Sequence, residues 1–379
     1  MINNQGFPVE LLDKSIEERI NYFNGYIANH PSINNIYKDL WETVENNGSY
    51  SMVYVFGPTG VGKTTLYNKV IKNLYKDEES NMAKNHGIIP FLGTRAIAPE
   101  YGNFDWKDFY MRTLEKLNEP LIGKKVLLSK EDDIKYNAYH NDKTTKAYRK
   151  SVENALKYRK TKVWLIDEAQ HMAKLSSGKK LLNQMDVIKS LAAETGTLII
   201  LFGTYSLQSF LNLSDQLSRR GKEIHFPRYK YDNKEELSMF ENVLWSFQKH
   251  IPLKNSIELV NHVNFFYERS LGCIGILKNW IERTYSTVLL KNNTELTIED
   301  FNKTALSISQ CIRIAEEIVM GEREQEETEE QRLSLIKKIG MSPINEGNNQ
   351  AKVNKKVKNQ RVGERSPKRD EVGVEKYAQ

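Results

Sequence analysis

A glycine-rich segment that lies between two periodic patterns constrains this chain more than any other feature. The run Met52–Phe56 is β-branched and aromatic, as in a buried strand, and a helical pattern follows Gly57–Thr64. This segment reads G-x-x-x-x-G-K-T in full, in the strand-to-helix context that the motif requires. Its glycines let successive backbone N–H groups surround phosphate oxygens. The alternative is a glycine-rich turn in an α/β protein that binds no nucleotide.

The end of the motif predicts a nucleotide site with a metal ion. Lys63 is expected to reach the outer phosphates of ATP, and the Thr64 hydroxyl is expected to ligate Mg²⁺. A second apolar run, Val163–Ile166, ends in Asp167 and Glu168. Strand ends face the crevice where doubly wound sheets bind ligands, so Asp167 is predicted to hold Mg²⁺ through water. Glu168 is predicted to polarise the water that attacks the γ-phosphate.

An ordinary pair of acidic residues at a helix start is the alternative for Asp167 and Glu168. Taken together, the motifs predict ATP and Mg²⁺ as the ligands. The residues predicted to bind ATP are Gly57, Pro58, Thr59, Gly60, Val61, Gly62, Lys63, Thr64, Thr65 and Asp167, with Thr64 and Asp167 as the magnesium ligands.

The order of strand and helix patterns predicts an α/β fold. Strand candidates at 52–56, 88–92, 163–166, 198–202 and 223–226 alternate with helical stretches, which favours a parallel five-stranded sheet flanked by helices. After Pro227 the helical spacing predicts a small all-helical domain. We therefore expect four parts: a helical lead-in over 1–46, an α/β core over 47–227, a helical domain over 228–320, and a charged, largely disordered tail over 321–379.

Composition excludes some classes of protein and leaves others open. Cys273 and Cys311 are too few and too far apart for a zinc site or a disulfide framework, which indicates a reducing compartment. The chain has no apolar run of the ~20 residues that a membrane span needs, so we expect a cytoplasmic protein with no membrane partner. The net charge of +6 fits a polyanionic partner but is also common among soluble proteins.

Two further polar features follow strand candidates. Thr204 follows the run at 198–202, where it is predicted to sense the γ-phosphate; a helix N-cap hydroxyl is an equal alternative. Arg219 and Arg220 precede the last strand candidate, where an arginine is predicted to project to the γ-phosphate of a neighbouring subunit. Two solvated arginines at a helix end are the alternative.

This order of motifs resembles the AAA+ ATPases over roughly residues 30 to 315. Within them the chain is most similar to the TnsC/TniB group of transposition regulators, and less closely to the origin-recognition initiators. The narrower resemblance rests on His30–Pro31, the segment Gly93–Asp108, Gly203–Thr204 and the lid motif Gly272–Leu277. One departure is Gly275, where many AAA+ lids place an arginine; Lys278, one turn later, is a weak substitute.

The resemblance implies a slow, assembly-dependent ATPase that forms a ring or helical filament on double-stranded DNA. Hydrolysis would control disassembly, and the protein would link target selection by a TniQ/TnsD-like protein to recruitment of a transposase. Residues that would contact DNA phosphates without reading bases are Arg95, Lys107, Lys146, Arg149 and Lys150. An exposed helix face with interspersed acidic residues is the alternative.

Two other functions remain open at this point. One is a helicase loader or replication initiator, although no strand-bearing module of the winged-helix kind is indicated after Pro227. The other is a signalling NTPase that binds no DNA, although the repeat arrays typical of that class are missing.

Overall fold

The computed structural model describes the chain with several gaps. The described residues are 6–46, 50–100, 102–125, 145–173, 179–208, 221–254, 257–291, 293, 295–326 and 328–341, with backbone alone at 173 and 179–184. The chain divides into two compact units, Met1–Glu326 and Glu327–Gln379, each described by itself below. The first unit contains the sheet and the candidate site.

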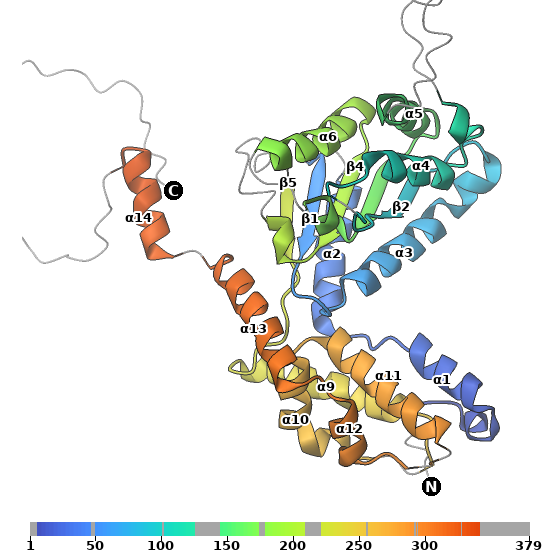
Figure 1. Cartoon of the computed structure of the whole chain (residues 1–379), viewed down its shortest axis with the longest axis vertical. Coiled ribbons are helices and arrows are strands. Elements are labelled where there is room, and N and C mark those ends of the chain that lie inside the picture. The colour runs from blue at the N-terminus through green and yellow to red at the C-terminus, as the bar shows by residue number, and fades with distance from the viewer. Residues whose placement is uncertain are drawn as a thin grey trace, which may run out of the picture. The chain divides into compact units, whose positions relative to one another are not determined.

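A five-stranded parallel sheet forms the centre of the first unit (Figure 1), which confirms the predicted fold class. Its order is β2-β3-β4-β1-β5. The strands are β1 (Met52–Phe56), β2 (Phe91–Arg95), β3 (Val163–Asp167), β4 (Leu198–Gly203) and β5 (Gly221–His225). The second strand begins at Phe91 and not at Ile88, because Pro90 has no N–H to donate; its carbonyl instead accepts from the N–H groups of Lys162 and Val163.

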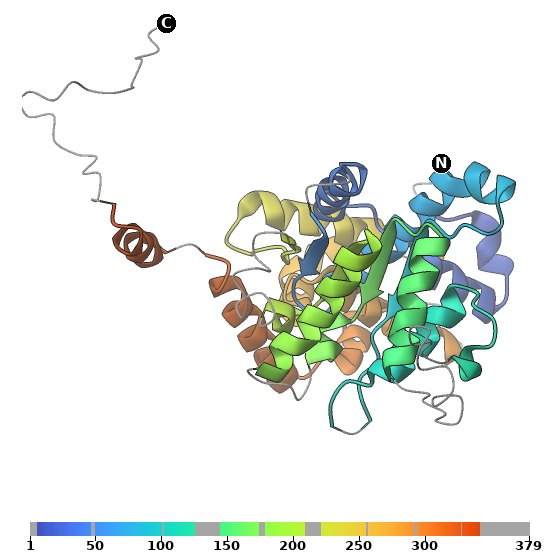
Figure 2. The same cartoon turned by 90° about the horizontal axis from the view of Figure 1, so that it is seen from above.

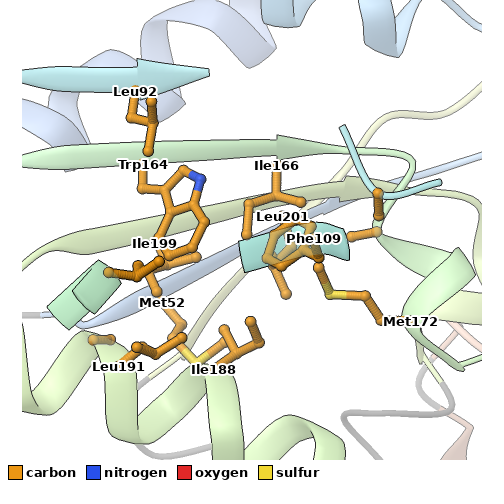
Figure 3. Close-up of a cluster of buried hydrophobic side chains, with 14 of the residues drawn as sticks. Met52, Leu92, Phe109, Trp164, Ile166, Met172, Ile188, Leu191, Ile199 and Leu201 are labelled. Carbon is orange, nitrogen blue, oxygen red and sulfur yellow. The ribbon is translucent and has the colours of Figure 1, made fainter. Parts of the chain in front are cut away.

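The two faces of the sheet pack against different helices (Figures 1 and 2). Along β1 the side chains alternate, so Tyr54 faces one cluster of buried residues and Val53 the other. Around Trp164, the first cluster (Figure 3) packs under α4 (Trp106–Lys116), α5 (Thr145–Tyr158) and α6 (Lys179–Thr195). The second cluster packs under α2 (Pro31–Glu45) and α3 (Lys63–Lys84). Both faces are therefore buried, as parallel sheets require.

The helices after β5 have a separate core that also includes the first helix of the chain. Phe23 of α1 is fully buried against Phe247 and Tyr285. The predicted lead-in is thus divided, with α1 packing on the helical domain and α2 on the sheet; the domain boundaries stay a prediction. The helices in this core are α1 (Ile16–Gly25), α9 (Lys234–His250), α10 (Val263–Ser270), α11 (Ile274–Leu290) and α12 (Ile298–Thr304).

The boundary predicted between 320 and 321 falls inside α13 (Ile308–Arg323). Glu322 is buried there because both of its carboxylate oxygens accept from the Arg228 guanidinium, at 3.0 and 3.2 Å. In the second unit, α14 (Glu329–Lys338) begins with a capping box between Thr328 and Gln331. The predicted tail therefore contains helical residues; 342–379 lie outside the described residues.

Short 3₁₀ helices join several of these elements. They are η1 (Val9–Asp13), η2 (Ile122–Lys124), η4 (Ala169–Ala173), η5 (Tyr205–Leu207) and η6 (Leu259–His262). Among the described helices, none combines the length and the apolar character that a membrane crossing would need.

Candidate active site

The glycine-rich segment connects β1 to α3, so this helix begins at the carboxyl end of β1. Gly62 caps α3 with a φ of +119°, a conformation that a residue with a Cβ rarely adopts. The first N–H groups of a helix have no partner within it, and the helix dipole adds partial positive charge there. The α3 N-terminus is consequently suited to hold anionic oxygens.

Lys63, the first residue of α3, is buried beneath this turn. Its ammonium donates to the carbonyls of Gly57 at 2.8 Å and Pro58 at 2.7 Å. Burial lowers the pKa of Lys63 to about 8, against the opposing influence of Asp167 and Glu168. Most molecules thus carry the charge at neutral pH, and an anionic ligand would favour the charged form further.

Thr64 and Asp167 meet although they come from different elements. The Thr64 hydroxyl donates to Asp167 Oδ2 at 3.1 Å, while Asp167 Oδ1 accepts from the Glu168 N–H at 3.0 Å. The pKa of Asp167 is raised from its ordinary value, because burial outweighs these two hydrogen bonds, which favour the charged form. A hydroxyl and a carboxylate are hard oxygen donors of the kind that Mg²⁺ prefers.

The described residues contain no cluster of three or more His, Cys, Asp or Glu that could hold a metal ion on its own. Mg²⁺ commonly takes one or two protein ligands and completes its shell with phosphate oxygens and water. The Thr64 and Asp167 pair therefore fits a magnesium ion that arrives with a nucleotide.

Glu168 sits in a strained turn, and its carboxylate is held by three side chains. Its φ is +56°, in the left-handed region that non-glycine residues rarely occupy. Glu168 Oε1 lies 3.7 Å from Arg95 Nη2, and Oε2 lies 2.6 Å from Gln170 Nε2 and 3.6 Å from His171 Nε2. The candidate base is therefore oriented by its surroundings.

Sequence analysis predicted none of the three side chains that contact the Glu168 carboxylate: Arg95, Gln170 and His171. Arg95 was grouped with the basic residues predicted to contact DNA, but it pairs in register with Asp167 at the end of β2. Gln170 follows the Asp-Glu pair by two residues, which is the one sequence signal that could have found it.

Thr204 lies at the end of β4, two strands from β2 and next to β3. It occupies the N-cap position of η5 but its hydroxyl caps no backbone N–H; instead it shares a hydrogen bond of 2.8 Å with the Ser206 hydroxyl. The Thr204 N–H donates to Gln170 Oε1 at 3.3 Å. A γ-phosphate-sensing role for Thr204 stays a prediction. Arg219 and Arg220 lie outside the described residues.

A cavity of about 220 Å³ adjoins the end of the glycine-rich turn. It lies between the segment that connects α1 to α2, the residues Val61, Gly62 and Thr65, and the first turns of α11. Ile27, one of its lining residues, is 62% exposed. The cavity has both apolar lining residues, such as Ile33, and polar ones, such as Asn279, beside the phosphate-binding turn. Sequence analysis had singled out the neighbouring His30–Pro31 without predicting this cavity.

The start of α11 rests directly on the glycine-rich turn. The Gly275 N–H donates to the Gly60 carbonyl at 2.6 Å, and a Cβ at Gly275 would come within 2.5 Å of that oxygen. An arginine at this position is therefore sterically excluded, which gives the departure from the AAA+ lid pattern a physical reason.

Lys278 is held by residues of α1 and α11, and whether it replaces the missing arginine stays a prediction. Its ammonium donates to the Phe23 carbonyl at the end of α1, lies 3.7 Å from the centroid of the Phe23 ring, and pairs with Glu282 at 2.9 Å. The pKa of Lys278 is lowered from its ordinary value, because burial outweighs the contact with Glu282, which favours the charged form. Lys278 thus ties α11 to α1 and is one of the residues that line the cavity.

The remaining basic residues predicted to contact DNA lie on α4 and α5. Lys107 reaches across from α4, with its ammonium 5.9 Å from the centroid of the Tyr148 ring on α5. Lys146 and Lys150 are exposed on α5. Arg149 is half-buried and pairs with Glu153 at 3.1 Å, as Lys150 also does. Lys107, Lys146 and Lys150 are accordingly the more accessible members of the group.

Comparisons with known proteins agree with this geometry at the level of the domain. A family model described as an AAA domain matches residues 46–211, which run from before β1 past β4, so this part of the chain is similar to AAA domains. No curated protein sequence matches the chain.

Solved structures resemble the chain only distantly. The ORC2 protein of Aeropyrum pernix is 13% identical with a TM-score of 0.46, over 75% of this chain and 71% of that one. A Walker-type ATPase of Pyrococcus abyssi is 15% identical with a TM-score of 0.45, over 77% and 74%. Domain III of the Thermotoga maritima replication initiation protein DnaA is 13% identical with a TM-score of 0.39, over 78% and 95%. Likeness at this level assigns no activity.

Proposed function

We propose that the AAA domain of this chain binds ATP with Mg²⁺ and hydrolyses the ATP to ADP and phosphate. The observation that carries the proposal is the convergence of Lys63, Thr64, Asp167 and Glu168, which come from α3 and the end of β3, at one edge of the sheet. A P-loop lysine, a hydroxyl, a buried carboxylate and a second carboxylate are the groups that phosphoryl transfer to water requires.

Each residue has a distinct role in binding. Lys63 exchanges the Gly57 and Pro58 carbonyls for the outer phosphate oxygens, and so gains charge-assisted hydrogen bonds. Thr64 and Asp167 would hold Mg²⁺, which when bound neutralises charge on the phosphates. The cavity beside Gly62 and Thr65 takes the adenine ring, with Ile27 packing against it.

Glu168 carries the chemical step. Its carboxylate orients the attacking water and accepts its proton as the oxygen approaches the γ-phosphorus. Thr204 would report the presence of the γ-phosphate from the end of β4.

Replacing Lys63 by Ala tests nucleotide binding. Loss of a buried charge from a charge-paired site costs ~2–5 kcal/mol, so ATP affinity is expected to fall by about 30-fold to several thousand-fold. Lys72→Ala, which removes an exposed ammonium from the same helix, should bind ATP like the wild type. Isothermal titration calorimetry on both variants, with circular dichroism as the check of folding, gives the answer. Equal affinity in all three proteins would remove the proposal.

We further propose that the chain acts on double-stranded DNA, as a homo-oligomer that links a target-selection protein of the TniQ/TnsD kind to a transposase. Exposed Lys107, Lys146 and Lys150 on adjacent helices support a phosphate-binding surface, and the net charge of +6 is in the same sense. Resemblance to the TnsC/TniB regulators supports the transposition role.

DNA binding through this surface should depend steeply on salt and little on sequence. Substituting Lys107, Lys146 and Lys150 by Ala is expected to reduce the slope of log K against log salt by about one for each lysine. Lys72, Lys76 and Lys84 on α3 provide a control triple variant with the same change in charge. Fluorescence anisotropy with two unrelated duplexes measures both effects. A wild-type protein that binds neither duplex would favour the signalling NTPase, and a sequence-selective profile would contradict the phosphate-binding surface.

A further inference from the structure

Gln170 joins the candidate base to the neighbouring strand. Its amide nitrogen donates to Glu168 Oε2 at 2.6 Å, and its amide oxygen accepts from the Thr204 N–H at 3.3 Å. A carboxylate can only accept and a backbone N–H can only donate, so these two neighbours fix which way the amide points. Both ends of one short side chain are thus committed to different elements of the site.

Gln170 lies against the end of β4. Gln170 belongs to η4, which follows β3 directly, and η4 packs against β4 and η5. A Cβ at Gly203, the last residue of β4, would come within 2.9 Å of the Gln170 amide oxygen. The absence of a side chain at Gly203 therefore lets the Gln170 amide approach the end of β4 closely. A shift of the backbone at the end of β4 would move Gln170 as well.

The Glu168 carboxylate is sensitive to such a shift. The backbone of Glu168 is in the left-handed conformation, with φ +56°. Its side chain is held by contacts with neighbouring side chains. The hydrogen bond from Gln170 is the shortest of the three contacts made to that carboxylate by Arg95, Gln170 and His171. A change in the position of Gln170 is therefore a change in the position of the base.

We propose that Gln170 is a positioning residue that relays the state of the β4 end, where Thr204 lies, to the Glu168 carboxylate. The inference rests on the proposed ATP hydrolysis and concerns its regulation. When the Thr204 hydroxyl leaves Ser206 for a phosphate oxygen, the backbone at Thr204 moves, and the Gln170 amide carries that movement to Glu168. Gln170 itself touches no reacting atom in this scheme.

Two substitutions separate the two ends of the relay. Gln170→Ala removes both hydrogen bonds. Gln170→Glu keeps an oxygen to accept from the Thr204 N–H, but it loses the donor to Glu168 and places a second carboxylate beside it. The free energy of one hydrogen bond to a charged group corresponds to a fall in kcat of about 10- to 100-fold, which we expect for either variant. The KM for ATP should change little.

A double-variant cycle with Thr204→Ala tests the relay itself. If Gln170 transmits the contribution of Thr204, the Gln170→Ala and Thr204→Ala losses in kcat do not multiply, and the double variant is about as slow as the slower single variant. Steady-state phosphate release gives kcat and KM, ATP binding by calorimetry gives Kd, and thermal unfolding checks that each variant is folded.

Each outcome decides one point. The relay would be overturned by an unchanged kcat in Gln170→Ala and Gln170→Glu, or by losses in kcat that multiply in the double variant. It would also be overturned if weaker ATP binding or lower thermal stability accounted for the slower rate. A wild-type protein that neither binds nor hydrolyses ATP would remove the proposed function instead. A lower kcat with unchanged Kd and KM, together with losses that do not multiply, is the result that the inference predicts.

Discussion

Replacing both Arg219 and Arg220 by Ala is expected to lower ATP hydrolysis by ~10³-fold or more, the size of effect that arginine fingers reach in general. The two residues precede β5 in the sequence, and the resemblance to AAA+ ATPases implies that an arginine there enters the site of the adjacent subunit. An arginine in that place would stabilise the charge on the transferred phosphoryl group. ATP binding by a single subunit should barely change, because Lys63, Thr64 and Asp167 come from the subunit's own chain.

Mixing two inactive variants shows whether the arginines act between subunits. In a mixture of the Arg219→Ala, Arg220→Ala double variant with Lys63→Ala, some interfaces pair an intact nucleotide pocket with intact arginines. Partial recovery of phosphate release in the mixture, and a wild-type rate per subunit that rises with protein concentration, are the expected results. A double variant that hydrolyses ATP at the wild-type rate would show that no arginine acts in trans.

Glu168→Gln is expected to lower kcat by about 10²- to 10⁴-fold, the usual contribution of a general base. The amide has nearly the shape of the carboxylate but cannot accept the proton from the attacking water. ATP binding should remain, because Glu168 lies beside the binding residues and is not one of them.

The matched control for this variant is Glu194→Gln on α6, which makes the same chemical change at an exposed position. Phosphate release at saturating ATP and equilibrium ATP binding are measured on both proteins. Hydrolysis by Glu168→Gln at the wild-type rate would mean that another group activates the water.

The phosphate end of the site could be predicted from sequence because each part is a local pattern. The glycine-rich turn, Lys63 and Thr64 are consecutive, and Asp167 and Glu168 end one apolar run. Parallel strands bring their carboxyl ends to one edge, which places the two segments together without further information. The contact between the Thr64 hydroxyl and Asp167 is the result.

The parts of the site that sequence analysis missed depend on contacts between distant segments. Arg95 resembles any exposed basic residue until the register of β2 and β3 places it opposite Asp167. The cavity needs α1, the glycine-rich turn and α11 in one place, and no local pattern specifies that arrangement. The steric exclusion of an arginine at Gly275 likewise depends on a distant segment, because the atom that would clash is the Gly60 carbonyl oxygen.

A single-turnover experiment on the wild-type protein shows whether the proposed ATPase site converts bound ATP to ADP. Protein in excess over radiolabelled ATP, with Mg²⁺, is sampled over time and the nucleotides are separated. We expect bound ATP to become ADP, faster at higher protein concentration, and Lys63→Ala to yield no ADP. Folded wild-type protein that binds ATP and returns it unchanged, at every concentration and with DNA present, would contradict it.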